Sequence, residues 1–205
     1  MSRLTLSYPI KPQFLVQEFG AKPDYYARFK DAFGNPEKGH MGVDFRAPHG
    51  LPVYAACDGM AYFQYDQHGG EGIYIRTGLF DYYGKQAKFN VINWHLIGNT
   101  DARYPSPIPL DGKQYPVKKG DLIGYADNTG APFESSGDHL HFGLQPLTEA
   151  NFIIEQANGF NGCIDPMPFF DGTYAQDTPR DDSYIAGLLE AAWELLRARF
   201  SAAAP

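Results

Sequence analysis

The stretch from Gly42 to Gly143 constrains the fold most, because short β-like runs alternate there with turns. Gly, Pro, Asn and Asp separate the runs at roughly hairpin spacing, and no helical period competes with them. The runs are GVDF, PVYAACDG, MAYFQY, GIYIRT, KFNVINWHL, DLIGYA and HLHFGL. Together with two short runs upstream, Leu4–Leu6 and Phe14–Phe19, they predict a mostly β fold of antiparallel sheet with a groove.

The C-terminal tail has a different pattern. Residues 172–182 read as a linker, and residues 183–200 follow helical spacing. The apolar side chains on one face of this helix are Ile185, Leu188, Leu189, Ala192, Trp193, Leu196 and Phe200. We therefore expect one domain over residues 1–171, and a linker with an amphipathic helix over residues 172–205. An apolar face needs a partner, so this helix is expected to dock on the domain or to pair with another chain.

Charge and composition exclude several classes of function. The 205 residues carry a net charge of −7 without a Lys/Arg cluster, which argues against a nucleic-acid partner. No apolar run approaches the roughly 20 residues that span a bilayer. The first residues show no signal-peptide pattern, so action outside the cytoplasm would require another delivery route or a leader absent from this sequence.

The chain has two cysteines, Cys57 and Cys163, which lie far apart in the sequence. One disulfide bond is an alternative, but two separate buried thiols are favoured. Neither cysteine belongs to a CxxC pair, which argues against a cysteine-based metal site.

Three compact motifs carry histidines. The third of them, His139-Leu140-His141-Phe142, has the simplest geometry. In a strand, successive side chains point to opposite faces, so the two histidines share one face and the two apolar residues share the other. Taken alone, an HxH pair is more often solvent-exposed than metal-binding.

The other two motifs follow the same rule. In Val91–Leu96, we expect Ile92, Trp94 and Leu96 on one apolar face and His95 on the other. In the first motif, His40-Met-Gly-Val-Asp44, the residues Val43 and Phe45 are expected in the core and Asp44 on the opposite face. Each motif alone is more often structural than catalytic.

The three motifs together point to a metal site. Neutral imidazole and carboxylate are suitable zinc ligands. Three protein ligands with one open position make the catalytic zinc arrangement, whereas structural zinc sites are closed. Histidines that are not ligands remain available for acid–base work near neutral pH.

The motifs also resemble a known family. GHMGVDFRAPHGLPVYAACDGMAYF, NWHL, VKKGDLIGYADNTG and HLHF come in the order found in the lysostaphin-type (LytM-like) zinc metalloendopeptidases, which hydrolyse bacterial peptidoglycan. The resemblance covers about residues 19–144, and CIDPMPFF is similar to a segment that follows the domain in many relatives. It implies a β-sandwich of the duplicated hybrid motif type. It also implies that His40, Asp44 and His141 bind Zn²⁺, and that His95 and His139 are catalytic.

The resemblance implies a mechanism and a substrate. Zinc lowers the pKa of a water molecule towards about 7, His139 acts as general base, and His95 steadies the oxyanion or positions the water. The substrate is a peptide of the peptidoglycan stem or cross-bridge. Segments 77–90 and 131–138 depart from the family pattern and are expected to flank the groove, where they would alter substrate preference.

Two alternatives concern function and delivery. A non-cleaving module that binds the cell wall, or activates another wall hydrolase, would use the same scaffold without catalysis. The missing signal peptide also suggests a phage lysis enzyme, an alternative that changes the delivery route to the wall but not the chemistry.

Structural roles are expected for the remaining histidines and for several other polar or aromatic side chains. His49 falls in a turn and His68 in a loop that borders the groove, and exposure is favoured for both. Core or surface roles are favoured for Tyr25, Tyr26 and Arg28 over contact with a substrate carbonyl. The apolar residues of CIDPMPFF are expected in the core, with Asp165 in a turn.

Overall fold

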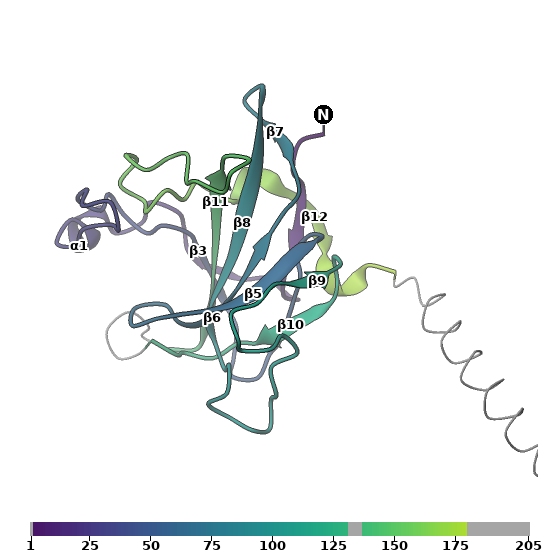
Figure 1. The fold of residues 1–205 in the computed structure, drawn as a ribbon. Helices are drawn as coiled ribbons and strands as arrows, with labels where there is room; N and C mark the ends of the chain where they lie inside the picture. Colours follow the sequence, from purple (N-terminus) through teal and green to yellow (C-terminus); the bar gives the residue numbers. More distant parts are fainter. Residues whose placement is uncertain (1, 131–136, 180–205) are drawn as a thin grey trace, which may run out of the picture.

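The computed structural model describes residues 2–130 and 137–179, and the fold is mostly β with antiparallel pairing, as predicted (Figure 1). One large sheet dominates. Its strands, in spatial order, are β2 (Leu15–Gln17), β3 (Val43–Arg46), β11 (His139–Leu147), β8 (Lys85–Leu96), β6 (Gly70–Arg76), β5 (Gly59–Asp66) and β9 (Tyr115–Val117). A further strand, β7 (Phe80–Tyr82), pairs with the start of β8.

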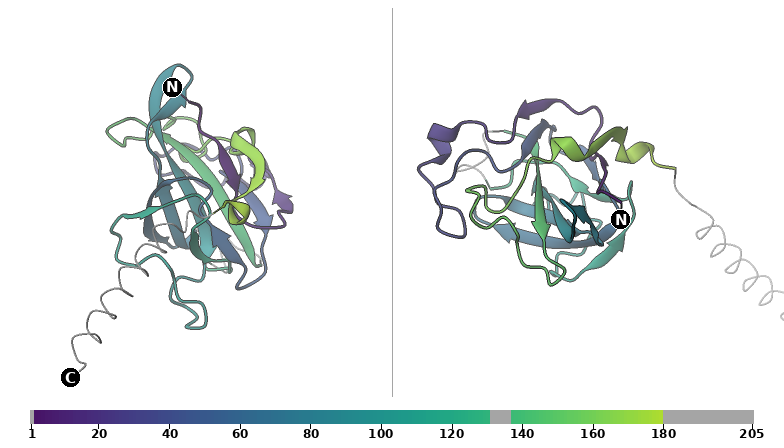
Figure 2. Two further views of the ribbon diagram at one scale, coloured as in Figure 1. Left: turned by 90° about the vertical axis from the view of Figure 1, so that its right-hand side faces the viewer. Right: turned by 90° about the horizontal axis from the view of Figure 1, so that it is seen from above.

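Two small sheets complete the fold. Strands β4 (Pro52–Tyr54) and β10 (Leu122–Tyr125) pair antiparallel, whereas β1 (Leu6–Tyr8) and β12 (Phe170–Tyr174) pair parallel. Figure 2 shows the N-terminal segment beside the yellow segment near residue 170. The short helical turns are α1 (Pro23–Tyr26), η1 (Met167–Phe169) and η2 (Ala175–Asp177).

The sequence suggested a linker from residue 172, but the described residues just after that position belong to the fold. Strand β12 crosses that boundary, and η2 buries Ala175 completely. The hydroxyls of Ser7 and Thr173 lie 2.7 Å apart, which ties β12 to β1. Residues 172–177 therefore pack on the domain, and the expected helix of residues 183–200 lies outside the described residues.

The main core lies on one face of the large sheet. Val43 and Phe45 of β3 and Leu140 and Phe142 of β11 are fully buried in it, as strand alternation predicts. Asp44, His139 and His141 consequently project from the opposite face. A smaller apolar cluster of Ile92, Trp94 and Cys163 lies apart from the main core.

Strand β8 departs from simple alternation near its end. Leu96 belongs to the main core while Ile92 and Trp94 belong to the smaller cluster, so the prediction that the three share a face is wrong. The cause is a β-bulge. Between the pairs Ile73↔Asn93 and Glu71↔Leu96, two residues of β8 oppose one residue of β6.

His95 sits in this bulge with a φ of 63°, a left-handed conformation that non-glycine residues rarely adopt. The bulge turns its side chain to the same side of the sheet as Trp94, and alternation alone would have placed the two on opposite faces.

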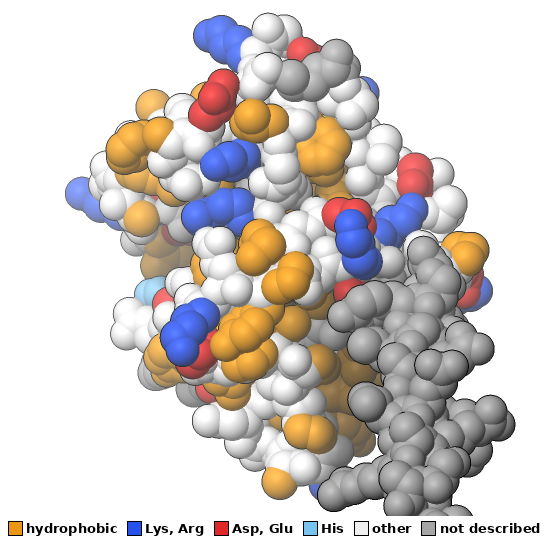
Figure 3. All heavy atoms as spheres, turned by 45° about the vertical axis from the view of Figure 1, so that its right-hand side comes forward, with side chains coloured by type: hydrophobic (Ala, Val, Ile, Leu, Met, Phe, Trp, Pro, Cys, Tyr) orange, Lys and Arg blue, Asp and Glu red, His pale blue; other side chains and the backbone are white. Residues whose placement is uncertain are grey.

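Several smaller expectations can be checked on the described residues. Cys57 and Cys163 are separate buried thiols without a disulfide bond, and Met167, Phe169 and Phe170 pack against the main core, both as predicted. No helix in the described part of the chain is long and apolar enough to span a membrane. On the face drawn in Figure 3, acidic and basic side chains are interspersed around a central apolar area.

Candidate metal centre and active site

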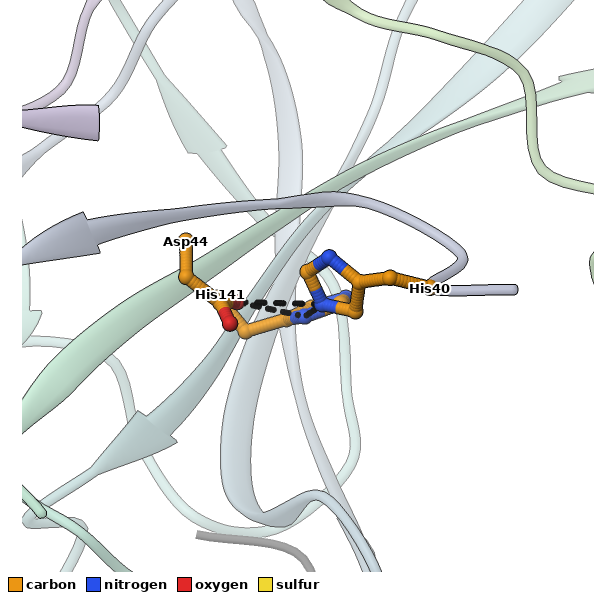
Figure 4. A group of neighbouring side chains, drawn as sticks. All are labelled: His40, Asp44 and His141. Carbon is orange, nitrogen blue, oxygen red and sulfur yellow. Dashed lines mark hydrogen bonds and ion pairs between the residues drawn. The ribbon is translucent and has the colours of Figure 1, made fainter. Parts of the chain in front are cut away.

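Three side chains converge on one point at the groove face of the sheet (Figure 4). The Nε2 atom of His40 lies 2.9 Å from Nδ1 of His141, and each of these nitrogens lies 3.1 Å from Oδ1 of Asp44. All three residues are buried, with exposed fractions of 4%, 7% and 8% for His40, His141 and Asp44. The structure thus brings together the three residues that the sequence predicts as metal ligands.

The sheet itself positions two of these residues. Asp44 and His141 are direct partners across the antiparallel pair β3–β11, so their side chains leave the sheet on the same face. Gly42 allows the His141 ring to lie against the start of β3, since a Cβ at Gly42 would stand 2.7 Å from two atoms of that ring.

The third ligand candidate is held by backbone hydrogen bonds. The His40 N–H donates to the Ala21 carbonyl at 3.0 Å, and the Gly20 N–H donates to the His40 carbonyl at 2.8 Å. Gly39 has a φ of 147°, and a Cβ there would stand 2.4 Å from the Gly20 carbonyl oxygen. A glycine is therefore required where the two segments cross immediately before His40.

The protons of this cluster fit a cation at its centre. The Nδ1–H of His40 donates to the Glu18 carbonyl at 3.2 Å, so Nε2 is the nitrogen that carries the lone pair when the ring binds a metal ion. That lone pair faces Oδ1 of Asp44 at 3.1 Å, and no proton is available between the two atoms. Nitrogen and oxygen ligands lie roughly 2.0–2.2 Å from Zn²⁺, which places neighbouring ligands about 3 Å apart. Both the donor set and its spacing therefore fit zinc.

Electrostatics keep the donors in their metal-binding forms. Burial by itself would raise the pKa of Asp44, but the hydrogen bond from His141 and the close approach of His40 outweigh burial and hold that pKa below its ordinary value. Burial lowers the pKa of His141, with the nearby Asp44 acting in the opposite direction. A charged carboxylate and neutral imidazoles are the forms that bind a metal ion.

Two further histidines complete the cluster. The Nδ1–H of His139 donates to the Gly137 carbonyl at 2.7 Å, and its Nε2 lies 3.7 Å from Oδ1 of Asp44. The Nδ1–H of His95 donates to the Thr129 carbonyl at 2.7 Å. The two rings lie 4.5 Å apart between centroids. Because a carbonyl oxygen can only accept, Nδ1 carries a hydrogen in both rings, and Nε2 is the nitrogen that can serve as a proton acceptor.

His95 stays neutral over a wide pH range. Burial, followed by the proximity of His141 and His139, lowers its pKa to about 3. At neutral pH its ring therefore carries no charge, and it can act as a hydrogen-bonding group but not as a resident cation.

The five side chains lie in a groove of about 1000 Å³. One wall comes from residues 16–37, including Lys22, Tyr25, Tyr26 and Lys30. The other side is lined by residues 66–69 of the β5–β6 turn and by residues 137–139. This volume lies at the upper end of the range of ligand pockets, roughly 300–1,000 Å³.

The groove corrects one sequence expectation. None of residues 77–90 lines it. That segment forms the β7–β8 hairpin at the top of Figure 1, and His95 lies ten residue steps along β8 from Lys85, or about 33 Å. Of residues 131–138, the described Gly137 and Asp138 do line the groove, and the others lie outside the described residues.

Residues 22–37 of the first groove wall were not identified as part of a groove from the sequence. Tyr26 stacks beside His40 with ring centroids 5.9 Å apart, and its hydroxyl accepts a hydrogen bond from Gln17 at 3.1 Å. Arg28 is absent from the groove lining, and its guanidinium lies over the Tyr25 ring. Exposed His68 borders the groove, as the sequence allowed. The segment has no catalytic motif, and only its aromatic run gave a signal.

His49 has more partners than the turn reading suggested. Its Nδ1 lies 2.8 Å from Oδ1 of Asp127, and its Nε2 lies 3.3 Å from Oδ2 of Asp101. The carboxylates come from distant loops, so the sequence held no signal for this cluster.

Comparisons with known proteins show which sequences and folds this chain resembles. No protein-family model matches the chain. The chain is 28% identical over 131 residues to the DD-carboxypeptidase/endopeptidase Mpg of Neisseria meningitidis and, with the same figures, to that of Neisseria gonorrhoeae. Each match covers 60% of this chain and 26% of the Neisseria protein, so it spans about a quarter of the length of these relatives.

A solved structure shows the same fold. The catalytic domain of the antimicrobial peptidase lysostaphin from Staphylococcus simulans superposes with a TM-score of 0.51 at 24% identity, covering 77% of this chain and 91% of that domain. The resemblance to lysostaphin-type peptidases is confirmed. It is carried by the fold together with the motifs that hold His40, Asp44, His95, His139 and His141.

Proposed function

We propose that the protein is a zinc-dependent endopeptidase that hydrolyses peptide bonds in peptidoglycan. The observation that carries the proposal is the convergence of His40 Nε2, Asp44 Oδ1 and His141 Nδ1 within about one ligand spacing, at distances of 2.9 and 3.1 Å. Three protein ligands on an open groove leave room for a further ligand, which distinguishes a catalytic zinc site from a structural one. The same resemblance supports the duplicated hybrid motif β-sandwich as the class of fold.

The metal ion and His139 have different proposed roles in the reaction. When bound, Zn²⁺ supplies Lewis acidity, which polarises a carbonyl and lowers the pKa of a water molecule to about 7. His139 is the proposed general base, because its Nδ1–H is committed to the Gly137 carbonyl and its Nε2 faces the cluster. It accepts the proton of the attacking water and returns it to the leaving amine, which is the ordinary cycle of a general acid–base group.

His95 has a separate proposed role. Its Nδ1–H is committed to the Thr129 carbonyl, and burial keeps its ring neutral. A neutral imidazole positioned beside His139 can orient the attacking water through its Nε2 lone pair. A role in steadying the oxyanion instead requires a hydrogen on Nε2, so the tautomer favours positioning of the water.

The groove and the relatives support a peptidoglycan peptide as substrate. Lysostaphin is described as an antimicrobial peptidase and Mpg as a DD-carboxypeptidase/endopeptidase. We propose D-alanyl–diaminopimelate cross-links as the preferred bonds over oligoglycine bridges. Lys22 and Lys30 line the groove, and their ammonium groups suit the carboxylates of stem peptides, which oligoglycine bridges lack. Segment 77–90 gives this preference no support, since it lies away from the groove.

Mass spectrometry of muropeptides tests the proposal. The full chain is incubated with a directly cross-linked wall and with a glycine-bridged wall, and His139→Ala serves as the matched control. New amino and carboxyl ends inside the peptides, formed faster from the directly cross-linked wall, are expected. New reducing sugars would identify a glycosidase instead. A folded, zinc-loaded protein that binds both walls without releasing products would identify the non-cleaving module.

A further inference from the structure

One short segment connects the two candidate catalytic histidines. We call residues 126–129 the strap. The Asp127 N–H donates to the His95 carbonyl at 2.8 Å, and the Asp127 carbonyl accepts the His139 N–H at 3.2 Å. The Thr129 carbonyl fixes the tautomer of His95 at 2.7 Å. The position of the strap therefore sets the backbone of both histidines and the ring orientation of one.

The strap is held from outside by His49. Its Nδ1 lies 2.8 Å from the Asp127 carboxylate, and its backbone N–H donates to Asp138, the neighbour of His139, at 3.2 Å. The ring is about one third exposed, whereas the side chains of Asp127 and Asp101 are only 18% exposed. His49 thus joins the strap to the loop that carries Asp101 and to the start of β11.

The hydrogen bonds require a charged ring. Both nitrogens of His49 face carboxylate oxygens, and a carboxylate can only accept, so both nitrogens must carry hydrogens. A neutral ring would donate to one carboxylate and present a lone pair to the other. The Asp127 carboxylate, followed by Asp101, raises the pKa of His49 above its ordinary value. Among the described residues, the other charged or titratable groups near His49 are Asp138, Arg103, which pairs with Asp101, and Tyr104.

We propose that His49 is a positioning residue, which in its protonated form holds the strap and through it aligns His95 with His139. The effect on turnover rests on the proposed function, whereas the effect on the two rings does not. A misplacement of 1 Å in an active site costs up to roughly 100-fold in rate. In His49→Gln the backbone hydrogen bonds of the strap remain, so the displacement should be smaller than about 1 Å. We therefore expect kcat to fall about tenfold, with KM and zinc content unchanged.

The sign of the pH dependence follows from the charged form. The imidazolium is present below the pKa of His49 in the folded protein and is lost as pH rises through it. Because that pKa lies above the ordinary value of about 6.5, the strap is expected to loosen at a higher pH than an ordinary histidine would set. The turnover of the parent should therefore fall as pH rises through the pKa of His49. The pH profile of His49→Gln should lack this fall, because glutamine does not titrate.

Nuclear magnetic resonance tests the proposal without relying on activity. The full-length, zinc-loaded protein is titrated while the ring signals of His49, His95 and His139 are followed. In the parent, the signals of His95 and His139 should shift with the midpoint of His49. Both His49→Gln and Asp127→Asn should abolish that shared step. Asp111→Asn is the control, because Asp111 pairs with Lys113 and Tyr115 and not with His49.

The outcomes are distinguishable. Ring signals of His95 and His139 that ignore the His49 titration, or that keep the shared step in folded His49→Gln, overturn the proposal. If His49→Gln does not fold, Asp101→Asn replaces it, and an unchanged His49 midpoint in that variant counts against the proposal. If the parent shows the shared step but cleaves no wall peptide, the proposed function fails and the positioning of the two rings stands.

Discussion

Gly42→Ala should damage the metal centre without adding or removing a ligand. A Cβ at this position would lie 2.7 Å from Cε1 and Nε2 of His141 and 2.6 Å from the Phe142 carbonyl oxygen. Carbon atoms in contact normally lie about 3.5–4.0 Å apart, so the His141 ring must move by about 1 Å. Zinc–ligand distances are held to within about 0.2 Å, and the displaced Nδ1 falls well outside that tolerance.

The expected result is a zinc affinity at least about tenfold lower and a kcat/KM about 100-fold lower. Overpacking of this kind should also lower the free energy of unfolding by roughly 1–3 kcal/mol. Zinc affinity is measured by competition with a chromophoric chelator, and stability by thermal unfolding of the metal-free protein.

Gly78→Ala is the matched control. No atom lies within 4 Å of a Cβ built at Gly78, and its φ is not positive. This variant should keep the zinc affinity and turnover of the parent. A folded Gly42→Ala protein with parental zinc affinity would refute the reasoning that the His141 ring position sets the site.

Three further predictions follow from the same geometry. His139→Ala and His95→Ala should each keep zinc and lower kcat by roughly 10²–10⁴, measured by peptide release, and loss of zinc from either would identify a misassigned ligand. The metal-free protein should lose stability as pH falls from about 6.5 to 3. In this range His95 is protonated in the unfolded chain, whereas burial keeps it unprotonated in the folded protein. His95→Gln should flatten this slope in acid-unfolding experiments, and a parental slope would contradict the assignment. Truncation after Pro179 should leave zinc binding intact, and sedimentation of both forms would show whether the tail mediates self-association.

The alternation of side chains along a strand was sufficient to predict the orientation of two residues of the candidate site. It correctly placed Asp44 opposite Val43 and Phe45, and His141 opposite Leu140 and Phe142. Those strands are regular and their two faces differ sharply in polarity, so the period of two is readable from the sequence.

Alternation failed at His95 because the strand is bulged there. An extra residue in β8 and a left-handed φ are set by how β6 pairs with β8, which no local pattern reveals. The hairpin of residues 77–90 was misplaced for a similar reason. Its distance from the site depends on the length and pairing of β8, and strand ends are not marked in the sequence.

Contacts between distant loops were also beyond the sequence. His49 meets Asp101 and Asp127 only after three separate segments fold together, so its turn context gave no hint of two carboxylate partners. The crossing of Gly20 and Gly39 that holds His40 is another contact of this kind.

A zinc titration of the metal-free full chain, read as cleavage of a cross-linked stem peptide, tests the central claim most directly. The three converging donors of His40, Asp44 and His141 form one site. Cleavage should therefore rise with added zinc and level off at about one equivalent per chain, and His141→Ala should remain inactive at that ratio. Full cleavage by the metal-free protein, or parental cleavage by His141→Ala at one equivalent, would contradict a zinc-dependent peptidase built on these residues.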